Sequence, residues 1–396
     1  MKEKRTLRKL IIYTGNFDEP ECSAAGKRVF GNALILESIG YEVLMIGKKQ
    51  NGELNHRKQY TDHIAFESYP QYGQIRFNRY LDYLTKRIGS KKPICIIRYG
   101  SPATSLFDYF LIRLAHRKGI KVIADVVDWL AADGRNVAFN FIKTVDTFLE
   151  KAVFNSMSDG VIAISSYLEK YYTNKVDNVI IIPPVVSKYR SNVAQNQEII
   201  VMYAGSPFRT GGKVKNIHKI KDRLDLAVTA FSELYKMGRI NFQFRIFGIT
   251  KEQYIQAFPD QKILLDSVNT SIEFLGKRPM NEIQDELSRA DFSLLFREIT
   301  RGTTAGFPTK VVESMSCGTP MITTKTSDLA DYIDDGQNGF FVDINNNKHL
   351  LVQLQRIMSL SIDEKAKLKE NCFKNQQFIY TLFKARMKRL IDSTVN

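Results

Sequence analysis

The chain has 396 residues, a length that suits about two domains of ordinary size. Its apolar content of 44% and charged content of 25% are typical of a globular protein, which excludes disordered, collagen-like and disulfide-scaffold chains. The cysteines are scattered and show no metal-ligand spacing, so we expect no metal site and a reducing compartment. They are Cys22, Cys95, Cys317 and Cys372.

The formal net charge is +15, and residues 1–190 carry 29 Lys and Arg against 19 Asp and Glu, which is +10. This charge has three interpretations: a solvated surface without a partner, attraction to an anionic membrane surface, or nucleic acid. No nucleic-acid motif is visible, so we expect no nucleic-acid partner. There is neither a signal-peptide core nor a run of about 18–20 apolar residues. We therefore expect a cytoplasmic protein, with a peripheral position on the inner face of the cell membrane left open.

The first half alternates short apolar runs with amphipathic segments. Apolar runs bounded by Gly, Pro or polar residues are typical of buried parallel strands, and the segments between them have helical periodicity. The expected strands are Lys9–Tyr13, Tyr41–Ile46, Pro93–Ile97, Lys121–Ala124, Gly160–Ile164 and Val179–Ile182, and the expected helices are Ala24–Ile39, Ser101–Lys118 and Ser165–Tyr172.

The second half repeats this rhythm after a polar stretch, Ser187–Glu198, which we expect to be a linker. The expected strands are Ile199–Ala204, Phe242–Phe247, Ile272–Leu275, Phe292–Phe296, Met321–Thr324 and Gly339–Val342, and the expected helices are Arg223–Met237, Met280–Ala290 and Lys310–Ser316.

Such alternation predicts an α/β protein of two Rossmann-like, doubly wound parallel-sheet domains that face a central cleft. The expected boundaries are 1–190 for the first domain and 191–367 for the second, with a closing helix at about 368–396 that packs back on the first. Ligands of such sheets bind outside the carboxyl ends of the strands. Functional residues should therefore lie in loops that follow strands.

The segment Arg297–Asp343 carries the most information. Gly306-Phe307-Pro308-Thr309 reads as a turn, and Thr309 is placed to cap the helix that begins at Lys310. Unpaired N–H groups at such a helix start suit phosphate oxygens. Glu313, about one turn on, could accept hydrogen bonds from the hydroxyls of a ribose. The alternative is a strand–turn–helix that merely packs.

The string GFPTKVVESMSCGTPMITT resembles the donor-sugar signature of the retaining family-4 glycosyltransferases of GT-B fold, and DDGQNGFFV resembles the hairpin that follows it. The resemblance is specific over roughly 45 residues and weaker elsewhere. It is closest to enzymes of capsule and exopolysaccharide biosynthesis. It implies that Gly205, Phe307, Pro308, Thr309, Lys310 and Glu313 contact the nucleotide-sugar donor.

One departure from the family pattern concerns the first of its two glutamates. Glu313 matches the second, but the first would fall at position 305, which is Ala305. Three interpretations stay open: a different sugar contact, a subgroup that uses another residue, or lost activity. The residues placed to contact the sugar instead are Arg297, Glu298, Arg301 and Gly306.

The family also carries a basic pair for the diphosphate. Lys221, which precedes an expected helix, is the best match for its lysine, and Arg209 stands in for an arginine that is Ser206 here. The resemblance implies a catalytic role for both, by stabilising the leaving diphosphate. Because Arg209–Arg223 is rich in lysine, the alternative for any one cation is a solvated loop.

In the first half, Gly15 follows the first strand where the family has a glycine loop near the donor phosphate. Asp128 matches the aspartate of a His-Asp pair that contacts the sugar, with Val127 where the histidine would be. We expect Asp128 to be catalytic. The alternatives are a glycine that merely follows a strand and an aspartate that caps a helix.

The resemblance implies transfer with retention from a nucleotide-sugar, UDP being the favoured nucleotide, to a saccharide or lipid-linked saccharide acceptor. It implies no metal and no cofactor other than the donor. The alternatives are an inactive GT-B partner of another transferase, which Ala305 favours, and an epimerase or phosphorylase. A Rossmann dehydrogenase is disfavoured because no GxGxxG follows the first strand.

Overall fold

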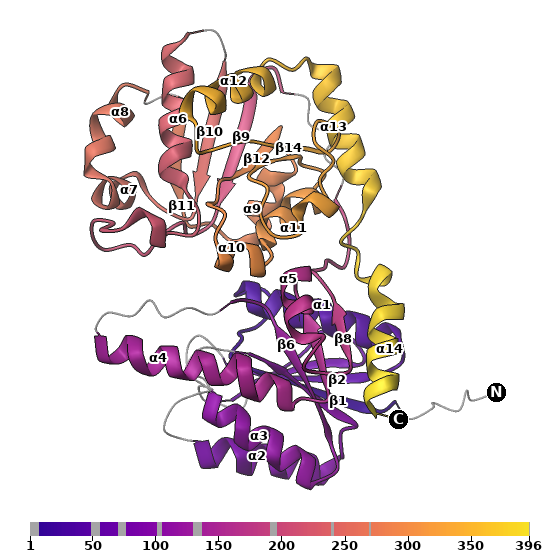
Figure 1. The fold of residues 1–396 in the computed structure, drawn as a ribbon. Coiled ribbons are helices and arrows are strands. Elements are labelled where there is room, and N and C mark those ends of the chain that lie inside the picture. The colour runs from indigo at the N-terminus through magenta and orange to yellow at the C-terminus, as the bar shows by residue number, and fades with distance from the viewer. Residues whose placement is uncertain are drawn as a thin grey trace, which may run out of the picture. The chain divides into compact units, whose positions relative to one another are not determined.

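The chain forms two compact units in its computed structural model (Figure 1). The structure describes residues 8–48, 56–69, 77–100, 105–129, 137–190, 196–238, 241–268 and 271–395. Unit 1 consists of Met1–Ser187, Ala305–Phe307 and Phe378–Asn396, and unit 2 consists of Lys188–Thr304 and Pro308–Gln377. The boundary between the two units at Ser187 and Lys188 falls at the start of the polar stretch that the sequence predicts to be a linker.

Unit 1 is built on a sheet whose described strands are parallel except for β3, which pairs antiparallel with β4 at one edge. The order is β3-β4-β2-β1-β5-β6-β7-β8. Chain order reverses between β1 and β5, which makes this the switch point of a doubly wound sheet. The strands are β1 (Leu10–Gly15), β2 (Glu42–Gly47), β3 (Arg57–Gln59), β4 (Ile64–Ser68), β5 (Cys95–Tyr99), β6 (Lys121–Val126), β7 (Gly160–Ala163) and β8 (Val179–Ile181).

Helices cover both faces of the unit 1 sheet because successive side chains of a strand point to opposite faces. Ile11 and Tyr13 belong to the core under α1 and α14, whereas Leu10 and Ile12 belong to the core under α2 and α3. The helices are α1 (Ala24–Ser38), α2 (Phe77–Ser90), α3 (Ser105–Arg117), α4 (Val137–Leu149) with the π-helical turn η1 (Glu150–Phe154), α5 (Ser166–Tyr172) and α14 (Lys384–Val395).

Unit 2 is built on a parallel sheet of order β11-β10-β9-β12-β13-β14, with its switch point between β9 and β12. This is the strand order of a dinucleotide-binding Rossmann sheet. The strands are β9 (Ile199–Ala204), β10 (Phe242–Phe247), β11 (Ile272–Gly276), β12 (Phe292–Leu295), β13 (Met321–Thr323) and β14 (Gly339–Phe341).

Aromatic and aliphatic side chains fix the helices of unit 2. Phe231 of α6 stacks on Phe244 of β10 with ring centroids 4.7 Å apart, and Ile283 and Leu287 of α9 pack with Met202 of β9. The helices are α6 (Leu224–Lys236), α7 (Lys251–Ala257), α8 (Lys262–Asp266), α9 (Met280–Leu287), α10 (Arg301–Ala305), α11 (Thr309–Ser316), α12 (Asn347–Met358) and α13 (Ile362–Asn375).

The closing segment is two helices, whereas the sequence suggested one at about 368–396. Helix α13 begins with a capping box of Ser361 and Glu364 and ends at Asn375, and its C-cap residue Gln376 has a φ of 38°, in the left-handed region. That conformation turns the chain out of the helix. Lys365 and Lys369 of α13 bind the buried carboxylate of Asp291, at 3.4 and 3.1 Å, so α13 belongs to unit 2. The part of the closing segment that belongs to unit 1 begins at Phe378 and contains α14.

Several strands and α-helices were not expected from the sequence: β3, β4, α2, α4, α7, α8, α10 and α12. The expected helix start at Ser101 lies outside the described residues, and α3 is described from Ser105. Within the described part of the chain, no helix combines the length and apolarity that crossing a bilayer requires.

We predict that Gly15→Ala destabilises unit 1. A Cβ at Gly15 would meet the Tyr99 carbonyl oxygen at 2.5 Å, because the ends of β1 and β5 approach closely there. Forcing an atom into packed structure typically costs about 1–3 kcal/mol. Trp129, the only tryptophan, lies in unit 1, so its fluorescence during urea denaturation reports this loss.

The control for this prediction is Gly89→Ala in α2, where a Cβ would meet no atom within 4 Å. It should leave the free energy of unfolding unchanged or raise it by up to about 1 kcal/mol, because alanine is the better helix former. Equal stability of Gly15→Ala and wild type would contradict the close approach.

Candidate functional site

The candidate site of unit 2 lies where β9 and β12 end, at the switch point of the sheet. Gly205 follows β9, Arg297 follows β12, and Lys310 lies in the first turn of α11. Adjacent parallel strands lead their following loops away in opposite directions at this point, which makes it the usual ligand position of such sheets. The sequence therefore brings three of its predicted donor and sugar residues to one place.

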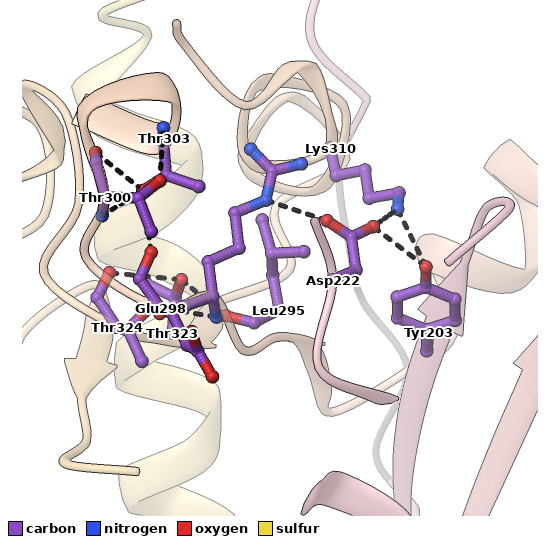
Figure 2. A network of polar contacts seen from close by, with 10 residues as sticks. Tyr203, Asp222, Leu295, Glu298, Thr300, Thr303, Lys310, Thr323 and Thr324 are labelled. Carbon is purple, nitrogen blue, oxygen red and sulfur yellow. Dashed lines mark hydrogen bonds and ion pairs between the residues drawn. The ribbon is translucent and has the colours of Figure 1, made fainter. Parts of the chain in front are cut away.

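A buried carboxylate that the sequence analysis did not single out joins these residues. Asp222 is 4% exposed; its Oδ1 accepts a hydrogen bond from Arg297 Nε at 2.8 Å, and its Oδ2 pairs with Lys310 Nζ. Tyr203, at the end of β9, donates to Asp222 Oδ2 at 2.9 Å and accepts from Lys310 Nζ at 2.9 Å. Figure 2 shows Tyr203, Asp222 and Lys310 converging. We call these four residues the Asp222 cluster.

Opposite charges decide the ionisation of the Asp222 cluster. Burial disfavours the ionised carboxylate, but the charges of Lys310 and Arg297 outweigh it and hold the pKa of Asp222 well below its usual value. Burial lowers the pKa of Lys310, and the Asp222 charge opposes that effect. One carboxylate thus faces two cations, which leaves a formal charge of +1 for an anionic ligand.

The Asp222 cluster also explains the residue that follows β9. A Cβ at Gly205 would overlap the Cε and Nζ atoms of Lys310. Only glycine leaves the lysine side chain room to lie against the end of β9, where its Nζ is also 4.5 Å from the centroid of the Tyr203 ring.

The start of α11 agrees in part with the sequence prediction. The helix runs from Thr309 to Ser316, and its N-cap is Pro308 rather than Thr309, with no side chain capping the first turn. Because no side chain caps them, the first backbone N–H groups of α11 suit an anionic ligand. Glu313, one turn on, is partly buried, and its charge favours the ammonium form of Lys310.

Glu298, a predicted sugar contact, is held in a second ion cluster. Its carboxylate pairs with Arg223 Nη1 and lies 3.0 Å from His218 Nδ1, and Arg223 also binds Asp225 through two hydrogen bonds of 2.7 and 2.9 Å. The hydrogen bond from His218 and the charge of Arg223 lower the pKa of Glu298. The main chain of Glu298 accepts from Thr303 Oγ1 at 2.7 Å (Figure 2).

The remaining predicted residues of this region lie outside the Asp222 cluster. Arg301 is exposed at the start of α10, and Lys221, next to Asp222, is exposed. Arg209 is exposed in the loop after β9, and among the described contacts none joins it to the cluster. The lysine that the structure places in the cluster is Lys310, not Lys221.

The segment Ala305–Phe307 groups with unit 1. Ala305 is fully buried, and its carbonyl accepts a hydrogen bond from Ser165 Oγ at 2.6 Å. Ser165 also caps α5. Gly306 and Phe307, predicted as sugar and donor contacts, are buried, and the Phe307 ring packs edge-on against Phe378. These observations give the segment a packing role beside any binding role.

The predicted residues of unit 1 show structural roles. Gly15 permits the close approach of β1 to β5, and the Oδ1 atom of Asp128 accepts a hydrogen bond from the amide of Trp129 at 2.9 Å. Residues 130–136, after Trp129, lie outside the described residues.

A buried carboxylate, Asp125, was missed at the end of β6. Arg28 binds it through three hydrogen bonds of 2.6–3.1 Å, and Tyr13 donates to it at 2.5 Å. Its signal in the sequence is a charge at the end of an otherwise apolar strand.

Strand order and site position define unit 2 as a Rossmann-like unit with its candidate site at the switch point. Comparison with known proteins shows which family most of this unit is similar to. Residues 214–375 match the model of the family described as "Glycosyl transferases group 1". This match covers less than half of the chain and contains Asp222, Arg297, Lys310 and Glu313.

The relatives agree with this assignment. WcaL of Escherichia coli (strain K12), named as a colanic acid biosynthesis glycosyltransferase, is 30% identical over 149 residues, which cover 37% of this chain and 35% of WcaL. The chain thus spans about a third of the length of the WcaL proteins it matches.

Solved structures match nearly the whole chain. A sucrose-phosphate synthase from Thermosynechococcus elongatus is 17% identical with a TM-score of 0.69, covering 97% of this chain and 98% of that one. HepE of Anabaena, solved with UDP and glucose, is 13% identical with a TM-score of 0.63, covering 96% and 99%. These likenesses establish the fold, which is GT-B, and confirm the predicted fold class.

We predict that Asp222→Asn destabilises unit 2 at neutral pH by about 3–5 kcal/mol, because Lys310 and Arg297 lose their buried counter-charge. The depressed pKa of Asp222 means that its stabilisation is complete above the unfolded pKa of about 3.9 and is lost as pH falls further. The free energy of unfolding of the variant should therefore fall less steeply than that of wild type as the pH becomes acidic. Hydrogen exchange of unit 2 peptides across pH measures both effects.

The matched control is Asp260→Asn. Asp260 is 85% exposed and pairs with Lys213 at 3.3 Å on the surface, so its loss should cost less than about 1 kcal/mol. A similarly small effect for Asp222→Asn would show that the cluster does not hold unit 2 together.

Proposed function

We propose that the protein is a glycosyltransferase of cell-surface polysaccharide biosynthesis. It moves a sugar from a nucleoside diphosphate donor, a UDP-sugar, to a saccharide or lipid-linked saccharide acceptor with retention of the anomeric configuration. The observation that carries the proposal is the Asp222 cluster at the switch point of a unit most of which matches the group 1 glycosyltransferase family. HepE, which shares the fold, was solved with UDP and with UDP-glucose, and that supports the choice of nucleotide.

The cations of the site give it a chemical role. When the bond between the sugar and the phosphate oxygen breaks, negative charge grows on the diphosphate. Lys310 and Arg297, already held in place by Asp222, stabilise that charge without having to reorganise. The first amides of α11 contribute partial positive charge in the same region. Glu313 binds the ribose hydroxyls.

Retention needs no nucleophile from the protein in this proposal. The acceptor hydroxyl attacks the face that the diphosphate leaves, and the departing phosphate takes its proton. We nominate no metal and no cofactor besides the donor. Asp128 remains our candidate for orienting the acceptor or sugar, and the excess of basic residues in 1–190 suits a lipid-linked acceptor at an anionic inner membrane face.

A second candidate function follows from position 305. A GT-B protein without the first family glutamate could act as an inactive partner of another transferase. Ala305 is fully buried with its carbonyl bonded to Ser165, which favours a packing role there. The two candidates differ in whether the site binds a nucleotide.

We predict that one of UDP, GDP and CDP binds the wild-type protein, UDP being expected, and that Glu313→Ala weakens its affinity by roughly 30- to 1000-fold. Losing two hydrogen bonds between ribose and a carboxylate costs on the order of 2–4 kcal/mol. Titration calorimetry measures this directly. Glu282→Ala, an exposed glutamate in the first turn of α9, is the control and should leave the affinity unchanged. Absence of binding by wild type would favour the inactive partner.

We also predict which lysine serves the diphosphate. Lys310→Met should weaken UDP by roughly 10- to 100-fold, the range for a charged hydrogen bond, and leave uridine affinity unchanged, because uridine lacks phosphates. Lys221→Met should change UDP affinity less, because Lys221 lies outside the Asp222 cluster. If Lys221→Met lost more UDP affinity than Lys310→Met, the result would indicate that Lys221, the lysine favoured by the sequence, binds the diphosphate.

A further inference from the structure

One face of the unit 1 sheet carries a cavity of about 140 Å³ beside the last turn of α2. The register of the strands places its floor on that face. Ile12 of β1 pairs with Leu44 of β2, and Leu44 pairs with Ala65 of β4. Ala65 in turn pairs with Gln59 of the edge strand β3. Because side chains of paired residues in neighbouring strands lie on the same face, these four residues form a continuous row across the cavity.

This cavity lies apart from the usual ligand position of a doubly wound sheet. Leu10 and Glu42, which both line it, are the first residues of β1 and β2. Ligands of such sheets bind beyond the opposite, carboxyl ends of the strands. The Asp222 cluster belongs to the other unit. The cavity is therefore separate from the site on which the proposed function rests.

A buried carboxylate with unused hydrogen-bonding capacity lines the cavity. Glu67 of β4 is 4% exposed. Its Oε2 accepts a hydrogen bond from Tyr83 and pairs with Arg87 Nη2 at 2.7 Å. Its Oε1 lies 3.3 Å from Arg57 Nη1, but within the described part of the chain it accepts no hydrogen bond. Since a buried acceptor without a donor is unfavourable, Oε1 points to a donor group on a ligand.

The charges around the cavity favour an uncharged ligand. The carboxylates and the cations that line it are equal in number: Glu42, Asp62 and Glu67, and Arg57, Arg87 and Lys91. Lys91 pairs with Glu42, as Arg87 does with Glu67. A ligand ammonium group at Oε1 would be repelled by Arg57 and Arg87, so a hydroxyl is the better donor.

The remaining lining suits a sugar ring. Leu44 is partly exposed and lies beside Ala65, which gives the C–H face of a ring an apolar surface. Hydroxyl groups both donate and accept, so they match a rim that offers both the Glu67 carboxylate and the Arg57 guanidinium. A cavity of about 150 Å³ can hold one benzene ring, so this cavity has room for a single six-membered ring.

We propose that this cavity binds one neutral hexose, with a sugar hydroxyl donating to Glu67 Oε1 and another accepting from Arg57. We call it the β4–α2 site and define it by Leu44, Arg57, Gln59, Ala65 and Glu67. It goes beyond the proposed function, because it holds a sugar without any nucleotide and away from the strand ends where transfer takes place.

The experiment is titration of the full chain, without nucleotide, with glucose, galactose and mannose. Saturation-transfer NMR measures affinity, and hydrogen exchange of peptides from residues 56–69 and 77–95 locates the bound sugar. At least one hexose should bind saturably and slow exchange in both segments. Glu67→Gln should weaken binding at least about ten-fold, because a hydrogen bond to a charged acceptor is lost. Arg57→Gln should weaken it about five-fold.

The matched control is Lys58→Gln. Lys58 lies between Arg57 and Gln59 on β3 but on the opposite face, because it pairs with Phe66 of the core under α1. This variant should bind the hexose like wild type. Arg57 is 61% exposed, so Arg57→Gln tests the site without disturbing the interior even if Glu67→Gln is unstable.

Trp129 fluorescence during urea denaturation verifies that the variants are folded. The proposal is overturned if none of the three hexoses binds wild type, or if the bound sugar slows exchange only outside the two segments. It is also overturned if Glu67→Gln and Arg57→Gln bind as tightly as Lys58→Gln. Since no nucleotide is present and every variant lies in unit 1, these outcomes are independent of nucleotide binding by unit 2.

Discussion

The carboxylate of Asp222 connects three segments of unit 2 that are distant in sequence: the end of β9 through Tyr203, the loop after β12 through Arg297, and the first turn of α11 through Lys310. An unpaired buried charge would be strongly unfavourable, so each partner depends on the others. The same carboxylate that makes the cluster stable leaves it with surplus positive charge. The interaction of one carboxylate with two cations therefore both holds the site in place and makes it favourable for an anionic ligand.

Unit 1 contains a related cluster of buried charges, but this cluster has a different role. Asp125 at the end of β6 is paired with Arg28 of α1 and bonded to Tyr13 of β1, and the residues are buried, with Asp125 at 0% and Arg28 at 3% exposed. Its charges are matched one to one, whereas one carboxylate serves two cations in unit 2. Both clusters lock a helix onto strand ends, but only the one in unit 2 has charge left for a ligand.

The sequence predicts most of the architecture because long apolar strands and capped helices carry their own signals. It misses β3, a polar edge strand of three residues, and α7, a helix of seven residues, because such short elements have little periodicity. It locates Gly205, Arg297 and Lys310 through motif spacing. It misses Tyr203 and Asp222 because their role depends on contacts across 88 and 107 residues, which no local pattern encodes. It prefers Lys221 to Lys310 for the same reason.

The left-handed residue Gln376 has a consequence for how the chain can be divided. Beyond it the polypeptide leaves unit 2, and α14 contributes Met387, Leu390 and Ile391 to the core that contains Ile11 and Tyr13 of β1. Residues from opposite ends of the sequence therefore share one core. A fragment that stops at Gln377 would keep all of unit 2 but deprive unit 1 of part of its interior. If the chain were expressed as separate N-terminal and C-terminal halves, the N-terminal half would therefore lack α14 and part of its own core.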